Sequence, residues 1–380
     1  MGDKNEQERQ KNSRERVMRV QFNAVLKDVT RKGTKIQTDE YLTEGKFPII
    51  DQGNNDIAGY RDDETGLFTD VPAIVFGDHT RIVKYITEPF FLGADGVKVL
   101  VPIDRTMNCK YLYYQLLSAK IPDTGYNRHF KWVKELEFQL PSRNEQDDVV
   151  KRLDKLCVVI SARQRQLAKL DELVKARFVE MFGDPVLNPY GFEKVPLSEL
   201  AEIKIGPFGS LLHKEDYIEG GHPLLNPSHI VDGNIVPDKK LTISDEKYNE
   251  LEAYHLHFGD VVMGRRGEMG RCAVVMGEGF LCGTGSLLIR TRGEVTADFI
   301  QKVISFPSFK KTIEDMAVGQ TMPNLNVPIV SRFQVVKPPV KVQHRYYSFI
   351  GEVDNLRQQV QKSIEKLKTL KGALMQQYFG

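Results

Sequence analysis

Two stretches of the sequence decide the fold: Pro141–Gly183, PSRNEQDDVVKRLDKLCVVISARQRQLAKLDELVKARFVEMFG, and Pro338–Gly380, PPVKVQHRYYSFIGEVDNLRQQVQKSIEKLKTLKGALMQQYFG. They align with each other without a gap. The matched positions are Gln146/Gln343, Leu153/Ile350, Gln164/Gln361, Leu167/Ile364, Leu170/Leu367, Leu173/Leu370, Ala176/Ala373 and the closing Phe182-Gly183/Phe379-Gly380. So many matches in one register indicate that the chain contains the same segment twice.

Both stretches carry apolar residues at the alternating three- and four-residue spacing of a heptad repeat. The predicted seam residues are Leu153, Leu156, Ile160, Leu167, Leu170, Val174, Ile350, Val353, Val360, Ile364, Leu367 and Leu374. Neither helical stretch has an internal proline, and each stops at glycine, which is common just past a helix end. Since one apolar seam needs another to bury it, we predict two long helices in an antiparallel coiled coil. That arrangement places the globular units at opposite ends. The alternative is an ordinary long helix packed on its own domain.

The regions that precede the two helices also correspond, although more loosely. Tyr41-Leu42-x-x-Gly45 answers Tyr217-Ile218-x-x-Gly221, and Phe90-Phe91-x-Gly93 answers Phe280-Leu281-x-Gly283. In both regions short β-rich runs alternate with Gly, Asn, Asp and Pro turns, and a short helix follows at 109–117 and 297–305. The sequence therefore predicts an α+β chain with two tandem small domains built on twisted sheets. The predicted segments are a charged extension (1–16), domain 1 (17–142), helix 1 (143–183), domain 2 (184–338) and helix 2 (339–380).

Composition limits the class of protein. The 380 residues suffice for two medium domains, and 41% of them are hydrophobic. No apolar run approaches the roughly 18 residues that cross a bilayer. Cys109, Cys157, Cys272 and Cys282 are far apart, with no zinc-ligand spacing, so we expect a cytoplasmic protein without a metal site. The net charge is only +2, so any nucleic-acid-binding surface must be local.

Sequence motifs of catalysis are missing. The chain has no Walker loop, H-E-x-x-H, G-x-S-x-G or dinucleotide G-x-G-x-x-G pattern. Asn188-Pro189-Tyr190 approaches the N-P-P-Y motif of adenine methyltransferases, but one proline is missing and no glycine-rich cofactor loop lies upstream. We therefore predict no catalytic residue in this chain, and a turn at Asn188.

Polar loops in each half have the side chains that DNA contacts require, namely cations for phosphates and amides or hydroxyls for base edges. The candidates in the first half are Asn55, Arg61, His79, Arg81, Lys84, Arg128, His129 and Lys131. Those in the second half are Ser210, Lys214, Arg265, Arg266, Arg271, Gln320, Thr321 and Asn324. Glycines beside several of them would let the backbone approach a ligand closely.

At this point the sequence resembles the specificity subunits of type I restriction–modification systems, over nearly the whole chain. The resemblance rests on motifs that recur in order around the two helices. They are 140–146 (LPSRNEQ), 181–185 (MFGDP), 188–192 (NPYGF), 197–200 (LSEL), 206–210 (GPFGS), 259–263 (GDVVM) running to Gly267 and Gly270, Gly319-Gln320 before Pro323-Asn324, and 378–380 (YFG). The first domain matches less well, since Phe76-Gly77-Asp78-His79 replaces the clearer glycine loop of the second.

The resemblance implies two target recognition domains, each of which reads one half of a bipartite, asymmetric site in double-stranded DNA. The helices would act as a ruler for the spacer and, with neighbouring surfaces, bind two methyltransferase subunits. Restriction subunits would join the same complex. S-adenosylmethionine, ATP and Mg²⁺ would then be bound by the partners and no cofactor by this chain. Two alternatives remain from the sequence: a coiled-coil scaffold without DNA specificity, or a DNA enzyme with unrecognised motifs.

Overall fold

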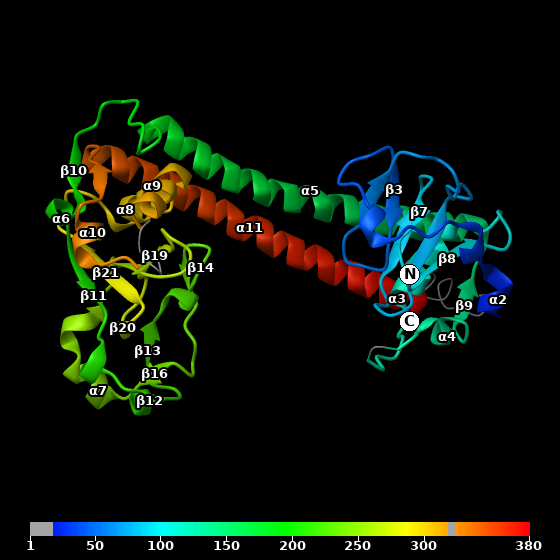
Figure 1. Cartoon of the computed structure of the whole chain (residues 1–380). Helices are drawn as coiled ribbons and strands as arrows, with labels where there is room; N and C mark the ends of the chain where they lie inside the picture. The colour runs from blue at the N-terminus through cyan, green and yellow to red at the C-terminus, as the bar shows by residue number, and fades with distance from the viewer. Residues whose placement is uncertain (1–17, 126, 318–323) are drawn as a thin grey trace, which may run out of the picture. The chain divides into compact units, whose positions relative to one another are not determined.

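The computed structural model describes residues 18–125, 127–317 and 324–380, which form two compact units. Unit 1 contains the described residues up to Gln166 together with Val360–Gly380, and unit 2 contains Leu167–Gln359. The long helices α5 (Arg143–Phe182) and α11 (Val340–Phe379) each contribute one part to both units (Figure 1). Each unit is therefore a globular domain with a piece of both helices.

Unit 1 is built on small, mainly antiparallel sheets. Its four-stranded sheet has the order β2 (Leu26–Asp28), β8 (Val97–Pro102), β5 (Ala73–Gly77), β6 (Val83–Ile86). A three-stranded sheet has the order β4 (Gly59–Arg61), β3 (Phe47–Ile50), β7 (Phe91–Leu92), and β1 (Met18–Gln21) pairs with β9 (Glu137–Leu140). The helices of this domain are α2 (Phe22–Val25), α3 (Cys109–Ser118) and α4 (Phe130–Val133).

Unit 2 has the same plan with insertions. Its four-stranded sheet has the order β11 (Ala201–Ile205), β21 (Ser286–Thr291), β18 (Val261–Gly264), β19 (Cys272–Val274). A five-stranded sheet has the order β12 (Tyr217–Ile218), β16 (Thr242–Ile243), β13 (His222–Leu225), β20 (Phe280–Cys282), β17 (His255–Leu256). The remaining elements are β10 (Lys194–Pro196) paired with β22 (Gln334–Val336), β14 (Ile230–Val231) paired with β15 (Asn234–Ile235), and helices α6 (Leu197–Leu200), α7 (Asp245–Glu250), α8 (Ala297–Ile304), α9 (Pro307–Ala317) and α10 (Val327–Ser331). The predicted tandem α+β architecture is confirmed, whereas the exact segment limits stay a prediction.

The duplication extends to single hydrogen bonds of the backbone. In unit 1, β3 and β7 pair in parallel with Ile50 opposite Leu92, and the next amide, Gly93 N–H, donates to Ile50 O at 2.8 Å. In unit 2, β13 and β20 pair in the same register, and Gly283 N–H donates to Leu225 O at 3.1 Å. The correspondence of Gly93 with Gly283 is thus structural as well as sequential.

A buried glutamine joins each long helix to its domain. In unit 1, Gln146 Oε1 accepts the Asn108 N–H at 2.9 Å, and its Nε2 donates to Pro141 O at 2.8 Å. In unit 2, Gln343 makes the equivalent bonds, to the Thr296 N–H at 2.9 Å and to Pro338 O at 2.8 Å. Both amide partners belong to N-cap residues, because Asn108 caps α3 and Thr296 caps α8. The repeated glutamine therefore fixes the short helix against the start of the long one.

The last turn of each long helix enters the core at the start of the other. In unit 2, the Phe182 ring lies 5.0 Å from the Phe299 ring and 5.5 Å from that of Tyr346. In unit 1, the Phe379 ring lies 5.3 Å from the ring of Tyr111, which occupies the place of Phe299. This packing explains why the two repeats end in the same Phe-Gly pair.

Within each unit the two long helices run antiparallel and side by side (Figure 1). In unit 1, Arg152 Nη1 donates to the Tyr378 hydroxyl at 3.3 Å. In unit 2, the Tyr346 hydroxyl donates to Val174 O at 3.3 Å, and Arg357 forms an ion pair with Asp171 at 2.6 Å. Of the predicted seam residues, Leu153, Leu170, Val353, Val360 and Ile364 are buried and the others half-buried. None of the helices in the described ranges has the length and hydropathy that crossing a membrane requires.

Candidate nucleic-acid interface

Three loops of unit 2 meet at Arg265, directly after β18. The Arg265 N–H donates to Gly285 O in the loop after β20, and the Leu325 N–H donates to Arg265 O, both at 3.0 Å. The Arg265 side chain returns the contact through Nε to Leu325 O at 2.9 Å. Main-chain groups thus hold residues 264–271, 283–285 and 324–325 together, and we call these, with the adjoining 206–210, the unit 2 loop cluster.

The fourth loop, 206–210, joins the cluster through Thr284, whose hydroxyl donates to Pro207 O at 2.8 Å. Gly206 N–H donates to Ser286 O at 3.1 Å, and a side chain at Gly206 would collide with Gly283 O. Only glycine fits where two backbones approach so closely. The segments 206–210, 264–267 and Asn324, which are far apart in the sequence, therefore lie next to one another.

Unit 1 repeats this arrangement with different side chains. The Asp78 N–H donates to Gly96 O, and the His129 N–H donates to Asp78 O, both at 2.7 Å. Asp78 therefore takes the place of Arg265, His129 that of Leu325, and Arg128 that of Asn324. We call residues 78–81, 93–96, 124–125 and 127–129 the unit 1 loop cluster.

Two residues that organise the unit 1 cluster were not predicted. The buried Asp78 carboxylate accepts the Phe130 N–H at 2.8 Å. Gln52 Oε1 accepts the His79 N–H at 3.1 Å, while its Nε2 donates to Asp95 O at 3.0 Å. The prediction selected cations, amides and hydroxyls for DNA contacts, so it passed over the acidic Asp78 beside His79, and Gln52 lies just before the predicted loop at Asn55.

Two of the arginines predicted to contact DNA form ion pairs within unit 1. Arg81 forms an ion pair with Asp123 at 2.6 Å, and Arg61 forms ion pairs with Glu40 and Asp63, each at 3.4 Å. A Gly125 N–H and the Arg81 charge hold the pKa of Asp123 below its usual range. Arginines paired in this way stabilise loop geometry more directly than they attract phosphates.

Two further candidates of unit 1 are buried. Lys84, in β6, is 7% exposed, and its Nζ reaches Asn55 O at 2.5 Å and Asp51 at 3.4 Å. His129 is 1% exposed, with Nδ1 3.0 Å from Asp78 O. These contacts give both side chains a structural role, and the side chain of Asn55 itself is exposed.

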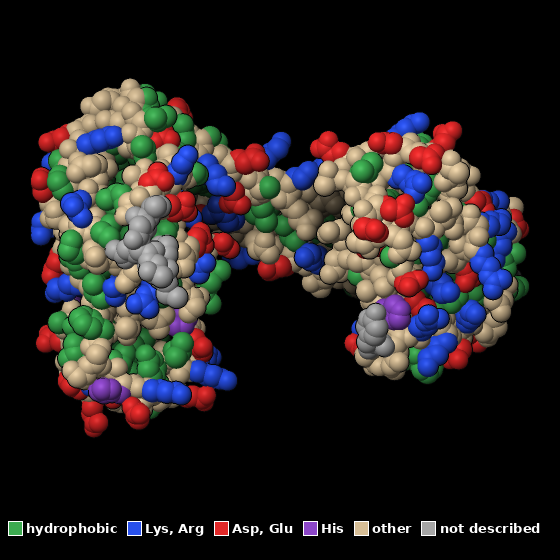
Figure 2. Space-filling view, viewed as in Figure 1, with side chains coloured by type: hydrophobic (Ala, Val, Ile, Leu, Met, Phe, Trp, Pro, Cys, Tyr) green, Lys and Arg blue, Asp and Glu red, His purple; other side chains and the backbone are tan. Residues whose placement is uncertain are grey.

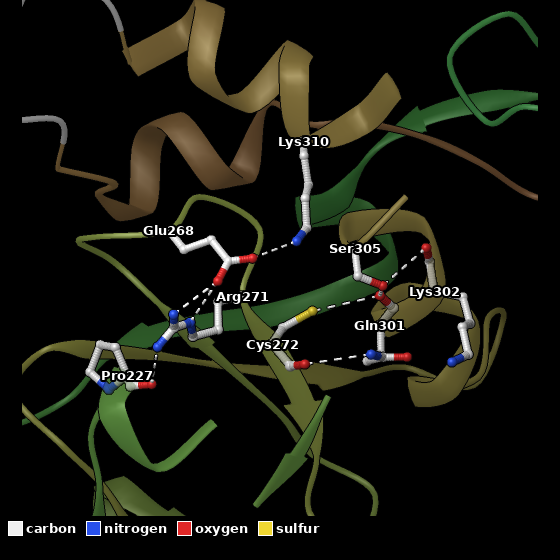
Figure 3. A network of polar contacts seen from close by, with 8 residues as sticks. All are labelled: Pro227, Glu268, Arg271, Cys272, Gln301, Lys302, Ser305 and Lys310. Carbon is white, nitrogen blue, oxygen red and sulfur yellow. Dashed lines mark hydrogen bonds and ion pairs between the residues drawn. The ribbon is translucent and has the colours of Figure 1, made fainter. Parts of the chain in front are cut away.

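In unit 2, Arg271 belongs to a charged network that ties the loop after β18 to α9 (Figure 3). Glu268 accepts from Lys310 at 2.8 Å and from Arg271 at 2.9 Å, and these two partners lower its pKa. Arg271 also donates to Pro227 O at 3.3 Å. Burial, and the neighbouring charge of Arg266, lower the pKa of Arg265, whose side chain contacts only carbonyls in the described part of the chain.

Five of the remaining candidates are exposed to solvent. The side chains of Arg128, Lys214 and Arg266 are exposed and have no hydrogen bond or ion pair with the described residues. Ser210 and Lys131 are exposed as well, with the Lys131 ammonium 5.0 Å from the Trp132 ring. His79 is half-buried, and Asn324 has a buried Oδ1 with no partner in the described ranges. Gln320 and Thr321 lie outside the described residues.

Basic and acidic side chains occur together on the surface of each unit. On the face in Figure 2, Lys and Arg side chains are interspersed with Asp and Glu over both units. This distribution agrees with the small net charge of +2. Attraction of DNA would therefore depend on local cations such as Arg266, since the net charge of the chain is small.

A cleft occurs at the equivalent place in each unit. In unit 2, a space of about 470 Å³ lies between the 230–233 hairpin, the start of β19 and α8. In unit 1, a space of about 710 Å³ lies between residues 54–56, β6 and α3. The first is lined by Arg271, Lys302 and Lys310, and the second by three tyrosines with Asp154. The duplication thus preserves the concavity and changes its chemistry.

The long helices expose apolar side chains at repeated positions. Val159 and Leu370 in unit 1, and Leu173 and Leu356 in unit 2, are each between 42% and 48% exposed. Val159 aligns with Leu356, and Leu173 with Leu370. They directly precede Ile160, Lys371, Val174 and Arg357, which all continue the three- and four-residue spacing of the seam, so the four share one heptad position. The helix pair therefore presents the same apolar flank in both units.

The chain is similar to known specificity proteins. A family model described as the type I restriction modification DNA specificity domain matches residues 23–172 and again 189–368. The type I restriction enzyme MjaVIII specificity subunit of Methanocaldococcus jannaschii is 20% identical over 313 residues, which cover 75% of this chain and 74% of that protein.

Solved structures show the same fold at low identity. The type I restriction–modification S subunit from M. genitalium is 18% identical, with a TM-score of 0.57 and 96% of both chains covered. A chain from a structure on complex assembly and conformational transition of the type I R-M system is 15% identical, with a TM-score of 0.63, and 96% of this chain and 97% of that one are covered.

Proposed function

Because the chain belongs to the family of type I restriction–modification DNA specificity proteins, we propose that it supplies the DNA target of such a complex. Each loop cluster reads one half of a split, asymmetric site in double-stranded DNA. One observation carries the proposal: the two clusters share their backbone hydrogen bonds but differ in side chains, with Asp78 at the place of Arg265 and Arg128 at that of Asn324. Equal scaffolds with unequal side chains suit two different half-sites.

Within each cluster we divide the roles by exposure and pairing. Arg128 and Arg266 are exposed and unpaired among the described residues, so they can reach phosphates or guanine edges without breaking an ion pair. Asn324 Oδ1 is buried, so we assign only the amide nitrogen of Asn324 to contact with a base edge. Arg81 and Arg271 shape the loops through their ion pairs, and Arg61, which lies in β4 outside the cluster, is also paired.

We propose that two methyltransferase subunits bind this chain, partly on the long helices. The apolar flank supports this, because Val159 and Leu370 in unit 1 are equivalent to Leu356 and Leu173 in unit 2 and so offer two copies of one partner the same exposed apolar side chains. Restriction subunits would join the assembled complex. Adenine methylation also requires the base to leave the stack, a step that would occur in the partners' active sites.

We further propose that the chain itself is not a catalyst and binds no cofactor. S-adenosylmethionine would be held by the methyltransferase subunits, and ATP with Mg²⁺ by the restriction subunits. The cytoplasm is the compartment that fits, because it contains the DNA and keeps thiols such as Cys109, Cys272 and Cys282 reduced.

Co-expression with a type I methyltransferase subunit from the same genome, followed by single-molecule mapping of methylated adenines, tests the proposal. We expect one split motif with a fixed spacer, which disappears when this chain is omitted. Replacing residues 1–142 by those of another member should change one half of the motif only. A complex that forms but methylates no motif would contradict DNA reading and favour the scaffold alternative. Methylation by the isolated chain would favour the enzyme alternative.

A further inference from the structure

An aromatic side chain of the unit 2 loop cluster is exposed to solvent. Phe208 is 62% exposed, and Leu211, one turn later, is 38% exposed. Large apolar side chains are costly to leave in water and mark contact sites when they occur together on a polar surface. The sequence had identified Phe208 only as part of the 206–210 motif.

The loop that carries Phe208 is fixed on both sides. Pro207 O accepts the Thr284 hydroxyl at 2.8 Å, and Gly206 packs against the carbonyl of Gly283. Gly209 follows at φ +65°, and a 3₁₀ turn covers Gly209–Leu211. A rigid loop loses little conformational entropy when its side chain binds, so this arrangement favours a contact site over a flexible segment.

The loop of Phe208 is linked through Thr284 to the segment that contains Arg265 and Arg266. Thr284, which holds the loop, also accepts from Arg265 Nη1 at 3.4 Å, and Arg266 is the next residue. Lys214, exposed and unpaired among the described residues, lies three residues beyond Leu211. An apolar group flanked by cations fits the chemistry of stacked bases between phosphates.

We propose that Phe208, with Leu211 beside it, is an apolar wedge that stacks on or inserts between bases of the half-site read by unit 2. The proposal rests on the proposed DNA-reading function and adds a local distortion of the duplex to it. Such a wedge unstacks a base step and exposes the faces of neighbouring bases.

The wedge is confined to one half of the target. In unit 1 the strand equivalent to β11 is β2, and the apolar side chains of the segment after it, residues 29–37, are those of Val29 and Ile36. They are 6% and 1% exposed, and the Ile36 N–H donates to Leu92 O at 2.9 Å, which holds Ile36 in the core. The distortion should therefore occur only in the half-site of unit 2.

The test uses the full chain in complex with its methyltransferase subunits and a duplex containing the mapped motif. Affinity is measured by fluorescence anisotropy, and unstacking by permanganate reactivity of thymines in both halves. Phe208→Ala should raise Kd by roughly 5- to 150-fold and abolish hyperreactive thymines in the unit 2 half. Phe208→Trp should retain the wild-type affinity and the hyperreactive thymines. Phe258→Ala is the matched control, because Phe258 is 64% exposed in the same unit but lies before β18, at the opposite end of that strand from Arg265 and the loop cluster.

The outcomes distinguish failure of the wedge proposal from failure of the proposed DNA-reading function. If the wild-type complex methylates its motif and Phe208→Ala matches Phe258→Ala in both measurements, the wedge is wrong and the proposed function stands. If Phe208→Ala instead loses its methyltransferase subunits, Phe208 contacts protein and the wedge is also wrong. If the wild-type complex methylates no motif, the proposed function fails first.

Discussion

Replacing Gln146 by leucine should destabilise unit 1 specifically. The side chain is 3% exposed, and it satisfies the Asn108 N–H at the start of α3 and the Pro141 carbonyl before α5. Leucine has a similar size but neither a donor nor an acceptor. The substitution therefore leaves two backbone groups without a partner while keeping the volume of the side chain.

The magnitude follows from the exposure of these groups. A buried polar group without a partner costs about 1–3 kcal/mol, and both backbone groups are partly accessible to water, so the sum is about 2 kcal/mol. With a urea dependence of about 2 kcal/mol per molar, the unfolding midpoint should fall by about 1 M. Trp132 is the single tryptophan of the chain and lies in unit 1, so its fluorescence reports this transition.

The matched control is Gln164→Leu. Gln164 is also a glutamine repeated in the second helix, as Gln361, but both are exposed. Its replacement should change stability by less than about 0.5 kcal/mol. If the Trp132 transitions of the two variants coincide, the buried glutamine does not fix α3 to α5, and the reasoning is refuted.

Three further predictions concern loops and charges. Arg266→Ala should weaken DNA binding and lower the slope of log K against log salt concentration by about one if Arg266 contacts a phosphate, or relax one target position at a cost of about 1–3 kcal/mol if it contacts a base. Arg81→Ala should leave that slope unchanged. Fluorescence anisotropy across a salt series distinguishes the two variants. Asp260→Asn should destabilise unit 2 by about 3 kcal/mol, because Asp260 is buried and accepts two bonds from Arg290, and calorimetry with Glu202→Gln as the exposed control measures it. The pKa of Glu268 is lowered by Lys310 and Arg271, so its stabilisation of residues 264–271 is present above the usual glutamate range and lost as pH falls through the lowered pKa. Hydrogen exchange between about pH 6 and about pH 3 should show that loss in the wild type and none in Glu268→Gln.

The two helices and the duplication could be predicted from the sequence because their signals are local and repeated. A heptad seam is visible in one segment, and a gap-free alignment needs no knowledge of tertiary contacts. The pairing of Phe182 with Phe379 was visible in the same way. Its cause, the docking of each helix end against Phe299 or Tyr111, required the structure.

Which cations are available to a ligand could not be predicted, because their partners come from other segments. Arg81 pairs with Asp123, forty-two residues away, and Lys84 reaches the carbonyl of Asn55 across a sheet edge. An arginine in a glycine-rich loop looks the same in the sequence whether it is paired or free. Arg265 and Arg266 are adjacent, yet one contacts carbonyls and the other is exposed.

The division of labour between backbone and side chain explains how one duplicated fold can serve two targets. The loop clusters are assembled mainly by main-chain hydrogen bonds, such as those between residues 78 and 96 and between 265 and 285, and nearly any residue can make these. Asp78 and Arg265 differ in charge without disturbing the shared bond. Substitutions of exposed and unpaired loop side chains such as Arg128 and Arg266 therefore leave the main-chain bonds intact and change what the cluster contacts. The glutamines at 146 and 343 show the reverse case, because there the side chain itself closes the bond and the same residue is found in both copies.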